Sequence, residues 1–240
     1  MSKTLTVNSS SWGAKAALAC YLLLIAGIFI SSFAVGVVLV ILRVVDYASL
    51  SFPLALISIP IGETIILGIV IFFARISHAH AAQLGLKKID ARTAITVMII
   101  GVVLIFIAGI IAAAETAIVG PDPSAEQLRL VVQPRDFTQL IALVALNLAL
   151  VGPAEELAFR GFIQKGFQSS FGKTAGLLSA SILFALLHGL NSLYSIAPIL
   201  VVALVLGYVW QRTGGNTTAT LLMHGVFNSV QIILVYFITV

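Results

Sequence analysis

The chain has 240 residues, of which 60% are hydrophobic and only 9% are charged. Soluble domains usually carry about a quarter charged residues, so this composition excludes an ordinary soluble protein and indicates a polytopic membrane protein. The formal net charge is only +4, and no nucleic-acid partner is expected. The single cysteine, Cys20, excludes an intramolecular disulfide.

Seven apolar runs follow one another along the chain, and we interpret each as a membrane-spanning helix. Their approximate ranges are 16–42, 53–73, 94–119, 137–168, 175–190, 196–210 and 217–240. The polar segment before the first run is short and is not typical of a cleavable signal peptide. We therefore expect an all-α, polytopic helical membrane protein with a single membrane domain over residues 1–240.

The fourth run is too long for one straight crossing. Residues 137–168 would measure about 48 Å as a helix, against a hydrocarbon core of about 30 Å. Proline removes a backbone donor, so the Gly152-Pro153 step can divide this run into two elements. The prediction is therefore seven to eight transmembrane helices.

Loop charges predict the orientation. Under the positive-inside rule the loops rich in lysine and arginine face the cytoplasm. With a cytoplasmic N-terminus, this side receives Lys3, Lys15, the basic loop 75–92, Lys165, Lys173 and Arg212. The connector 120–136 and the nearly uncharged loop around Asn191 then lie on the opposite side. We expect a multi-pass protein in contact with lipids, located in the cell membrane if the source is prokaryotic.

Three charged residues interrupt the fourth run: Glu155, Glu156 and Arg160. Charges within a membrane segment cost several kcal/mol, so they need partners or a function. Glu156 and Arg160 are four residues apart, which predicts a salt bridge along one helix face, mainly structural in role. Adjacent residues differ by about 100° around a helix, so Glu155 is left freer for chemistry.

Two later segments supply further polar pairs at helical spacing. Phe184 precedes His188 by four residues, and His224 precedes Asn228 by the same interval. Taken alone, either histidine could be a structural hydrogen-bonding residue. If these faces converge on Glu155, one carboxylate, two imidazoles and one amide surround a polar cavity. That set suits hydrolysis, because the carboxylate can take a proton from water while an imidazole and an amide stabilise an oxyanion.

Two points stay open at this stage. Glu155, His188 and His224 could instead serve as three zinc ligands with water as the fourth, although no HExxH motif occurs. Glu63 lies in the second run without an obvious partner, and it can face a cavity or pair with a polar residue of another helix.

The three motifs EExxxR at Glu155, FxxxH at Phe184 and HxxxN at His224 resemble, in this order, those of the CPBP family. These are the CAAX-processing intramembrane proteases, also called the Abi or type II CAAX prenyl endopeptidase family. The motifs occupy about the C-terminal third of the chain, and the family-like catalytic core is expected over about 137–240. The resemblance implies an all-helical membrane fold whose cavity opens to the cytoplasm and to lipid.

The resemblance also implies roles for individual residues. Glu155 is similar to the base that activates water, and His188 is similar to the residue that assists it. His224 and Asn228 are similar to the pair on the side of the oxyanion. The resemblance implies that Glu156, Arg160 and Phe184 are supporting residues. Members have been classed both as metalloproteases and as metal-independent glutamate proteases, so possible zinc dependence stays open.

The leading hypothesis is an intramembrane endopeptidase that cleaves a membrane-associated peptide or lipidated protein near the cytoplasmic face. One alternative is a non-catalytic immunity or scaffolding protein of the same fold. Another is a proton-coupled transporter that uses Glu63, Glu155 and the histidines as a relay.

Overall fold

The computed structural model describes residues 12–41 and 47–239, and this part of the chain is helical with no strand. Lys3, Leu42 and Val240, which belong to the predicted orientation and span boundaries, lie outside these residues. The long helices are α1 (Ala14–Ile41), α2 (Tyr47–Ile76), α3 (Ala91–Val119), α7 (Lys165–Gly189), α8 (Ile196–Arg212) and α9 (Thr217–Thr239). The shorter ones are α4 (Ala125–Val132), α5 (Phe137–Leu146), α6 (Gly152–Glu156) and the 3-10 turn Leu193–Ser195.

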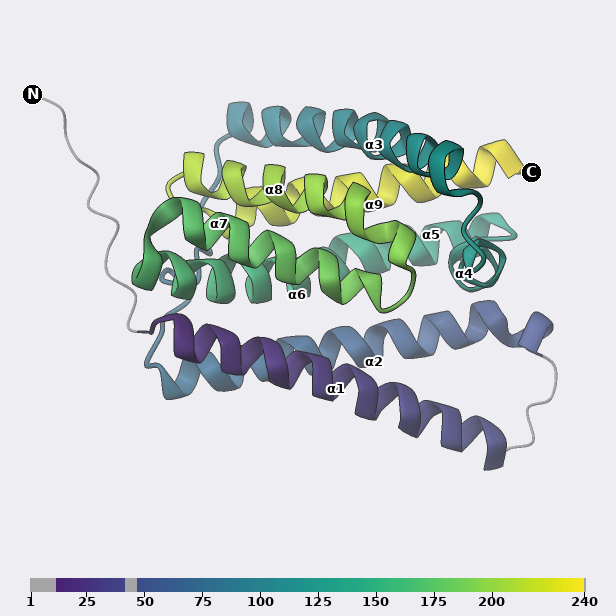
Figure 1. Ribbon diagram of the computed structural model, residues 1–240, viewed down its shortest axis with the longest axis horizontal. Helices are drawn as coiled ribbons and strands as arrows, with labels where there is room; N and C mark the ends of the chain where they lie inside the picture. The colour runs from purple at the N-terminus through teal and green to yellow at the C-terminus, as the bar shows by residue number, and fades with distance from the viewer. Residues whose placement is uncertain (1–11, 42–46, 240) are drawn as a thin grey trace, which may run out of the picture.

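Six helical stretches of the described residues are long and apolar enough to cross a membrane, so this is an integral membrane protein. The predicted count of seven to eight spans is not confirmed. The longest stretch, Phe137–Gly189, has 53 residues and includes both the fourth and the fifth predicted runs. Its backbone leaves helical geometry at Gly172 (φ 85°, ψ 173°), a positive φ that favours glycine. The chain reverses there, and the two limbs lie side by side (Figure 1).

The Gly152-Pro153 step does not divide the fourth run, so the eighth helix expected from such a break does not form. Gly152 has helical angles (φ −53°, ψ −49°), and its N–H donates to the Asn147 carbonyl five residues back. Wider π-helical segments flank the step at Asn147–Val151 and Leu157–Gln164. A π-helical turn tolerates the absence of the backbone N–H donor at proline, which explains why the helix axis continues through Pro153.

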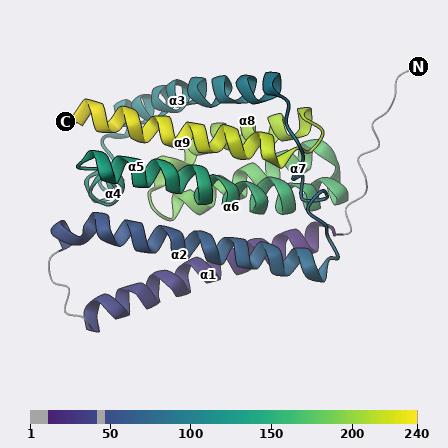
Figure 2. The ribbon, with the colours of Figure 1, turned by 180° about the vertical axis from the view of Figure 1, so that it is seen from behind.

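The helices form three layers (Figure 1). Helices α1 and α2 pack together on one side, and α3, α8 and α9 lie on the other. The continuous run α5–α6–α7 passes between them, in contact with both layers (Figure 2). The central layer therefore carries the charged motif to the middle of the bundle.

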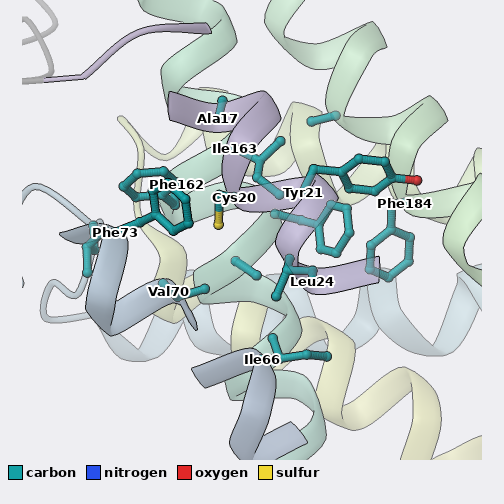
Figure 3. Packing of buried hydrophobic residues seen from close by; sticks show 14 of the residues in the cluster. Ala17, Cys20, Tyr21, Leu24, Ile66, Val70, Phe73, Phe162, Ile163 and Phe184 are labelled. Atoms are coloured by element: carbon teal, nitrogen blue, oxygen red, sulfur yellow. The ribbon is translucent and has the colours of Figure 1, made fainter. Parts of the chain in front are cut away.

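An aromatic cluster joins α1 to the central layer (Figure 3). Trp12 stacks on Phe162 with ring centroids 4.7 Å apart, and its indole N–H donates to the Phe162 carbonyl at 2.9 Å. The Tyr21 hydroxyl donates to the Leu183 carbonyl at 3.0 Å. Burial of these rings fixes α1 against both limbs of the reversed run.

The two ends of the bundle differ in charge. We call the end formed by the loop 77–90, the turn at Gly172 and the α8–α9 junction the basic end. There the Lys87 ammonium donates to the Gly214 carbonyl and the Lys165 ammonium to that of Gln83. The other end, here the connector end, holds residues 120–136 and the loop 190–195. Between the two ends many large apolar side chains are exposed, including Phe29, Ile30, Phe33, Ile110 and Ile118, as expected of lipid-facing surfaces.

Candidate active site

One carboxylate oxygen at the centre of the bundle accepts two hydrogen bonds. Glu156 Oε1 accepts from Arg160 at 2.8 Å and from His224 Nδ1 at 3.0 Å. Glu156 and Arg160 are almost fully buried, with 0% and 1% of their side chains exposed. The predicted salt bridge is therefore present. It also reaches a histidine of another helix, which the spacing alone did not predict.

The guanidinium of Arg160 has further partners. It donates to the Ala203 carbonyl of α8 at 3.1 Å and lies 4.7 Å from the centre of the Phe184 ring. Phe184 also contacts both histidine rings, with centroids 4.5 Å from His188 and 5.9 Å from His224. The expected supporting residues Glu156, Arg160 and Phe184 thus form one contiguous unit.

Close backbone approach makes this unit possible. A Cβ on Gly152 would lie 3.2 Å from the Gly225 nitrogen and 3.3 Å from the Leu221 carbonyl oxygen. These distances are tighter than most Cβ contacts, so a side chain at this position would require α6 and α9 to move apart by a few tenths of an ångström. Because Glu155 and Glu156 follow Gly152 within one turn, both carboxylates are brought beside His224.

Glu155 lies on the other side of the same imidazole. Its Oε2 is 3.7 Å from His224 Nε2, and its side chain is 13% exposed. The two adjacent glutamates therefore face different nitrogens of one ring. Since a carboxylate only accepts, His224 Nδ1 carries the proton toward Glu156, which leaves Nε2 directed at Glu155.

His188 is oriented by its own helix. Its Nδ1 lies 3.0 Å from the Phe184 carbonyl oxygen, which can only accept, so we assign the proton to Nδ1. In the neutral ring Nε2 is then an acceptor. This tautomer suits a residue that orients water or receives its proton.

Two cavities separate the predicted set. A cavity of about 280 Å³ is lined by Glu155 and His188, together with Glu63, Ser31 and Asn191. A larger and mostly apolar cavity of about 560 Å³ is lined by Asn228, Asn147 and, again, Glu63. The predicted single cavity is thus two adjoining spaces, with Glu155 and His188 in one and Asn228 in the other, and the buried His224 lines neither.

Sequence reasoning missed Asn147. Its Oδ1 accepts from Asn228 Nδ2 at 3.0 Å, and its own amide donates to the Leu143 carbonyl at 2.8 Å. A lone asparagine within an apolar run is the signal that could have indicated this role, because a polar side chain in lipid needs a partner. Asn147 orients the amide of Asn228, whose second N–H can still donate to another group.

The proposed zinc set does not fit the arrangement of the side chains. Among residues 12–41 and 47–239, no group of three His, Cys, Asp or Glu side chains could hold a metal ion. Nδ1 of His224 and of His188 faces Glu156 and a backbone carbonyl, an arrangement that metal-binding histidines also show, so only the spacing of the side chains speaks against the set. We derive no chemical step through a metal.

A hydrogen-bonded group of Asp122, Ser124 and Ser192, here called the polar clasp, lies at the connector end next to the smaller cavity. The Asp122 carboxylate accepts from the hydroxyls of Ser124 and Ser192, each at 2.6 Å, and these bonds lower the pKa of Asp122. Ser192 immediately follows Asn191, which lines the cavity. The clasp therefore ties the loop after α7 to the connector before α4.

The family model of the type II CAAX prenyl endopeptidase Rce1-like proteins matches residues 137–230. The match begins with α5 and contains all three motifs, although it covers less than half of the chain. Neither the curated proteins nor the solved structures contain a significant match.

The family resemblance predicted from the motifs is thereby confirmed. At family level the match supports a CAAX-type intramembrane protease, and the family implies a peptidase. Membrane lipids and peptide substrates are the partners that such a family suggests.

The central salt bridge leads to a prediction about stability. Glu156→Gln removes the charge that compensates the buried Arg160, and breaking one side of a buried pair costs about 3–5 kcal/mol. The thermal unfolding temperature of the purified protein in detergent should fall strongly. The matched control is Glu126→Gln, since Glu126 pairs with Arg129 on the surface, where the side chains are 66% and 54% exposed. That change should cost about 1 kcal/mol or less. Equal effects of the two substitutions would contradict the central role of Glu156.

Proposed function

We propose that the protein is an intramembrane endopeptidase that hydrolyses a peptide bond of a membrane-associated peptide or lipidated protein. The observation that carries this proposal is the position of Glu155. It shares a small cavity with His188 and lies 3.7 Å from His224, whose other nitrogen is held by Glu156. A carboxylate next to two oriented imidazoles has the composition of a general-base site.

The proposed reaction begins with a water molecule in the smaller cavity. Glu155 takes its proton while Nε2 of His188 orients it, and the water oxygen attacks the scissile carbonyl carbon. The developing oxyanion accepts from the second N–H of Asn228, and from His224 Nε2 when that ring is protonated. Because Asn228 lines the larger cavity, this arrangement requires a substrate that extends across both cavities.

The hypothesis from sequence places cleavage near the cytoplasmic face of the membrane, whereas the cavities lie nearer to the connector end. Ser31 and Glu63 lie about 25 Å and 20 Å along their helices from the basic end, and Asn191 belongs to the connector end. Both cavities therefore extend from the middle of the bundle toward the connector end. If the basic end is cytoplasmic, as proposed from the loop charges, these positions favour entry from lipid or from the opposite face.

Replacement of Glu155 tests the proposed function. Glu155→Gln keeps the size of the side chain but removes the base, and loss of a general base typically costs a factor of about 10²–10⁴ in rate. Proteomics of membrane-protein ends in cells with wild-type or Glu155→Gln protein should show cleavage products that disappear in the variant. The position of the new ends relative to the membrane also reports the side of cleavage.

The matched control is Glu115→Gln, because Glu115 is a carboxylate of a different membrane helix, α3, and lines a separate cavity. This variant should retain the products. Identical protein ends in wild-type and Glu155→Gln cells, with both proteins inserted and folded, would favour the non-catalytic scaffold. Proton-coupled flux in proteoliposomes would favour the transporter.

A base mechanism carried by Glu155 also predicts the response to metal removal. Activity of the purified protein on a peptide containing the identified cleavage site should survive extensive treatment with a chelator, and added zinc should not increase it. Loss of activity with the chelator and recovery with zinc would establish a metal requirement and would overturn the metal-independent mechanism.

A further inference from the structure

The described part of α2 carries a carboxylate that the proposed reaction does not yet use. Glu63 is only 9% exposed, and its Oε2 is buried without a hydrogen-bond partner. An ionisable group inside a membrane helix is costly and usually has a function. Packing alone therefore does not explain why Glu63 occupies this position.

Its position relative to the cavities is specific. Glu63 and Ile59, one turn apart on α2, line both the 280 Å³ cavity and the 560 Å³ cavity. On one side Glu63 shares its cavity with Glu155 and His188, and on the other with Asn147 and Asn228. The carboxyl group thus lies where a substrate extending across both cavities would pass.

A purely structural role would be expected to provide partners, as Glu156 shows. Oε1 of Glu156 receives donors from both Arg160 and His224, whereas none of the salt bridges in the described structure includes Glu63; Oε2 lacks a donor in both residues. The guanidinium that lines the larger cavity, that of Arg129, forms a salt bridge with Glu126. Two negative charges in one small cavity repel each other, so Glu63 and Glu155 together are favoured when they hold one proton.

The chemistry of amide hydrolysis requires such a proton. When the C–N bond breaks, the departing nitrogen must be protonated, and the proton taken from water resides on Glu155. In a neutral His188, Nε2 is an acceptor, because Nδ1–H is bonded to the Phe184 carbonyl. A protonated His224 is committed to the carbonyl oxygen in the mechanism above. Two acids that line the smaller cavity are then left, the newly protonated Glu155 and Glu63, and only Glu63 also lines the larger cavity.

We propose that Glu63 is a second catalytic carboxylate, which donates its proton to the leaving nitrogen while Glu155 receives one from the attacking water. This inference rests on the proposed function. Water adds its oxygen to the carbonyl carbon and gives one proton to Glu155, and the C–N bond breaks as Glu63 gives its proton to nitrogen. Transfer of the proton from Glu155 to Glu63 restores the starting state, so the net reaction consumes one water and yields an acid and an amine.

Two substrates that differ only in the leaving group test this proposal. One is a peptide spanning a cleavage site identified as above, and the other is its depsipeptide, in which the scissile N–H is replaced by oxygen. An alkoxide leaves with far less need of a proton than an amide nitrogen does. Glu63→Gln should lower kcat for the peptide by a factor of about 10²–10⁴ and should lower it much less for the ester. Glu63→Asp should retain part of the peptide activity, and Glu155→Gln should abolish cleavage of both substrates.

The outcomes distinguish a failure of the role proposed for Glu63 from a failure of the proposed protease function. If wild-type protein cleaves neither substrate and no cellular protein ends depend on Glu155, the proposed function fails. If wild-type protein cleaves both and Glu63→Gln is unaffected, or slows both equally, Glu63 is not the acid and the function stands. Glu115→Gln provides the control for loss of a carboxylate elsewhere in the membrane, and thermal unfolding in detergent verifies that each variant is folded.

Discussion

A single shared hydrogen-bond acceptor organises this protein. Glu156 Oε1 binds Arg160 of its own helical run and His224 of α9, so one oxygen joins a salt bridge to an imidazole that lies next to Glu155. Buried charges are stable only when they are paired and hydrogen-bonded. The Ala203 carbonyl and the face of Phe184 complete the surroundings of the guanidinium. The cost of burying Arg160 is thus offset by the same contacts that orient the candidate site.

The surrounding fold serves to bring this oxygen and the imidazole together. Gly152 allows α6 to approach α9, and the π-helical segments on either side let the run pass Pro153 without a break. The reversal at Gly172 then places Phe184 and His188 of the second limb beside the first. The π-helical segments and the reversal depart from regular helical geometry, whereas Gly152 keeps helical angles and contributes through the absence of a side chain. This pattern agrees with the general observation that π-helical turns occur at functional sites.

The sequence predicted local relations well and tertiary ones less well. Spacings of four residues correctly indicated the Glu156–Arg160 pair and the contact of Phe184 with His188, because helical geometry alone determines them. The bond from His224 to Glu156 depends on the distance between two helices, which spacing does not encode. The role of Asn147 and the division into two cavities depend on packing in the same way. The Gly152-Pro153 step does not divide the fourth run, because a π-helical segment can accommodate proline. The predicted seven to eight spans are not confirmed, since the fourth and fifth runs belong to one of the six apolar helical stretches of the described residues.

The central claim is that Glu156 fixes the Nδ1–H form of His224 and so directs Nε2 toward Glu155. Nitrogen-15 NMR of histidine-labelled protein in lipid measures this directly, with the His224 signals assigned by their loss in a His224→Gln variant. We expect a protonated, hydrogen-bonded Nδ1 whose signal changes when Glu156 is replaced by glutamine and not when Glu126 is replaced. A neutral ring with its proton on Nε2, or a spectrum that does not respond to loss of Glu156, would contradict it.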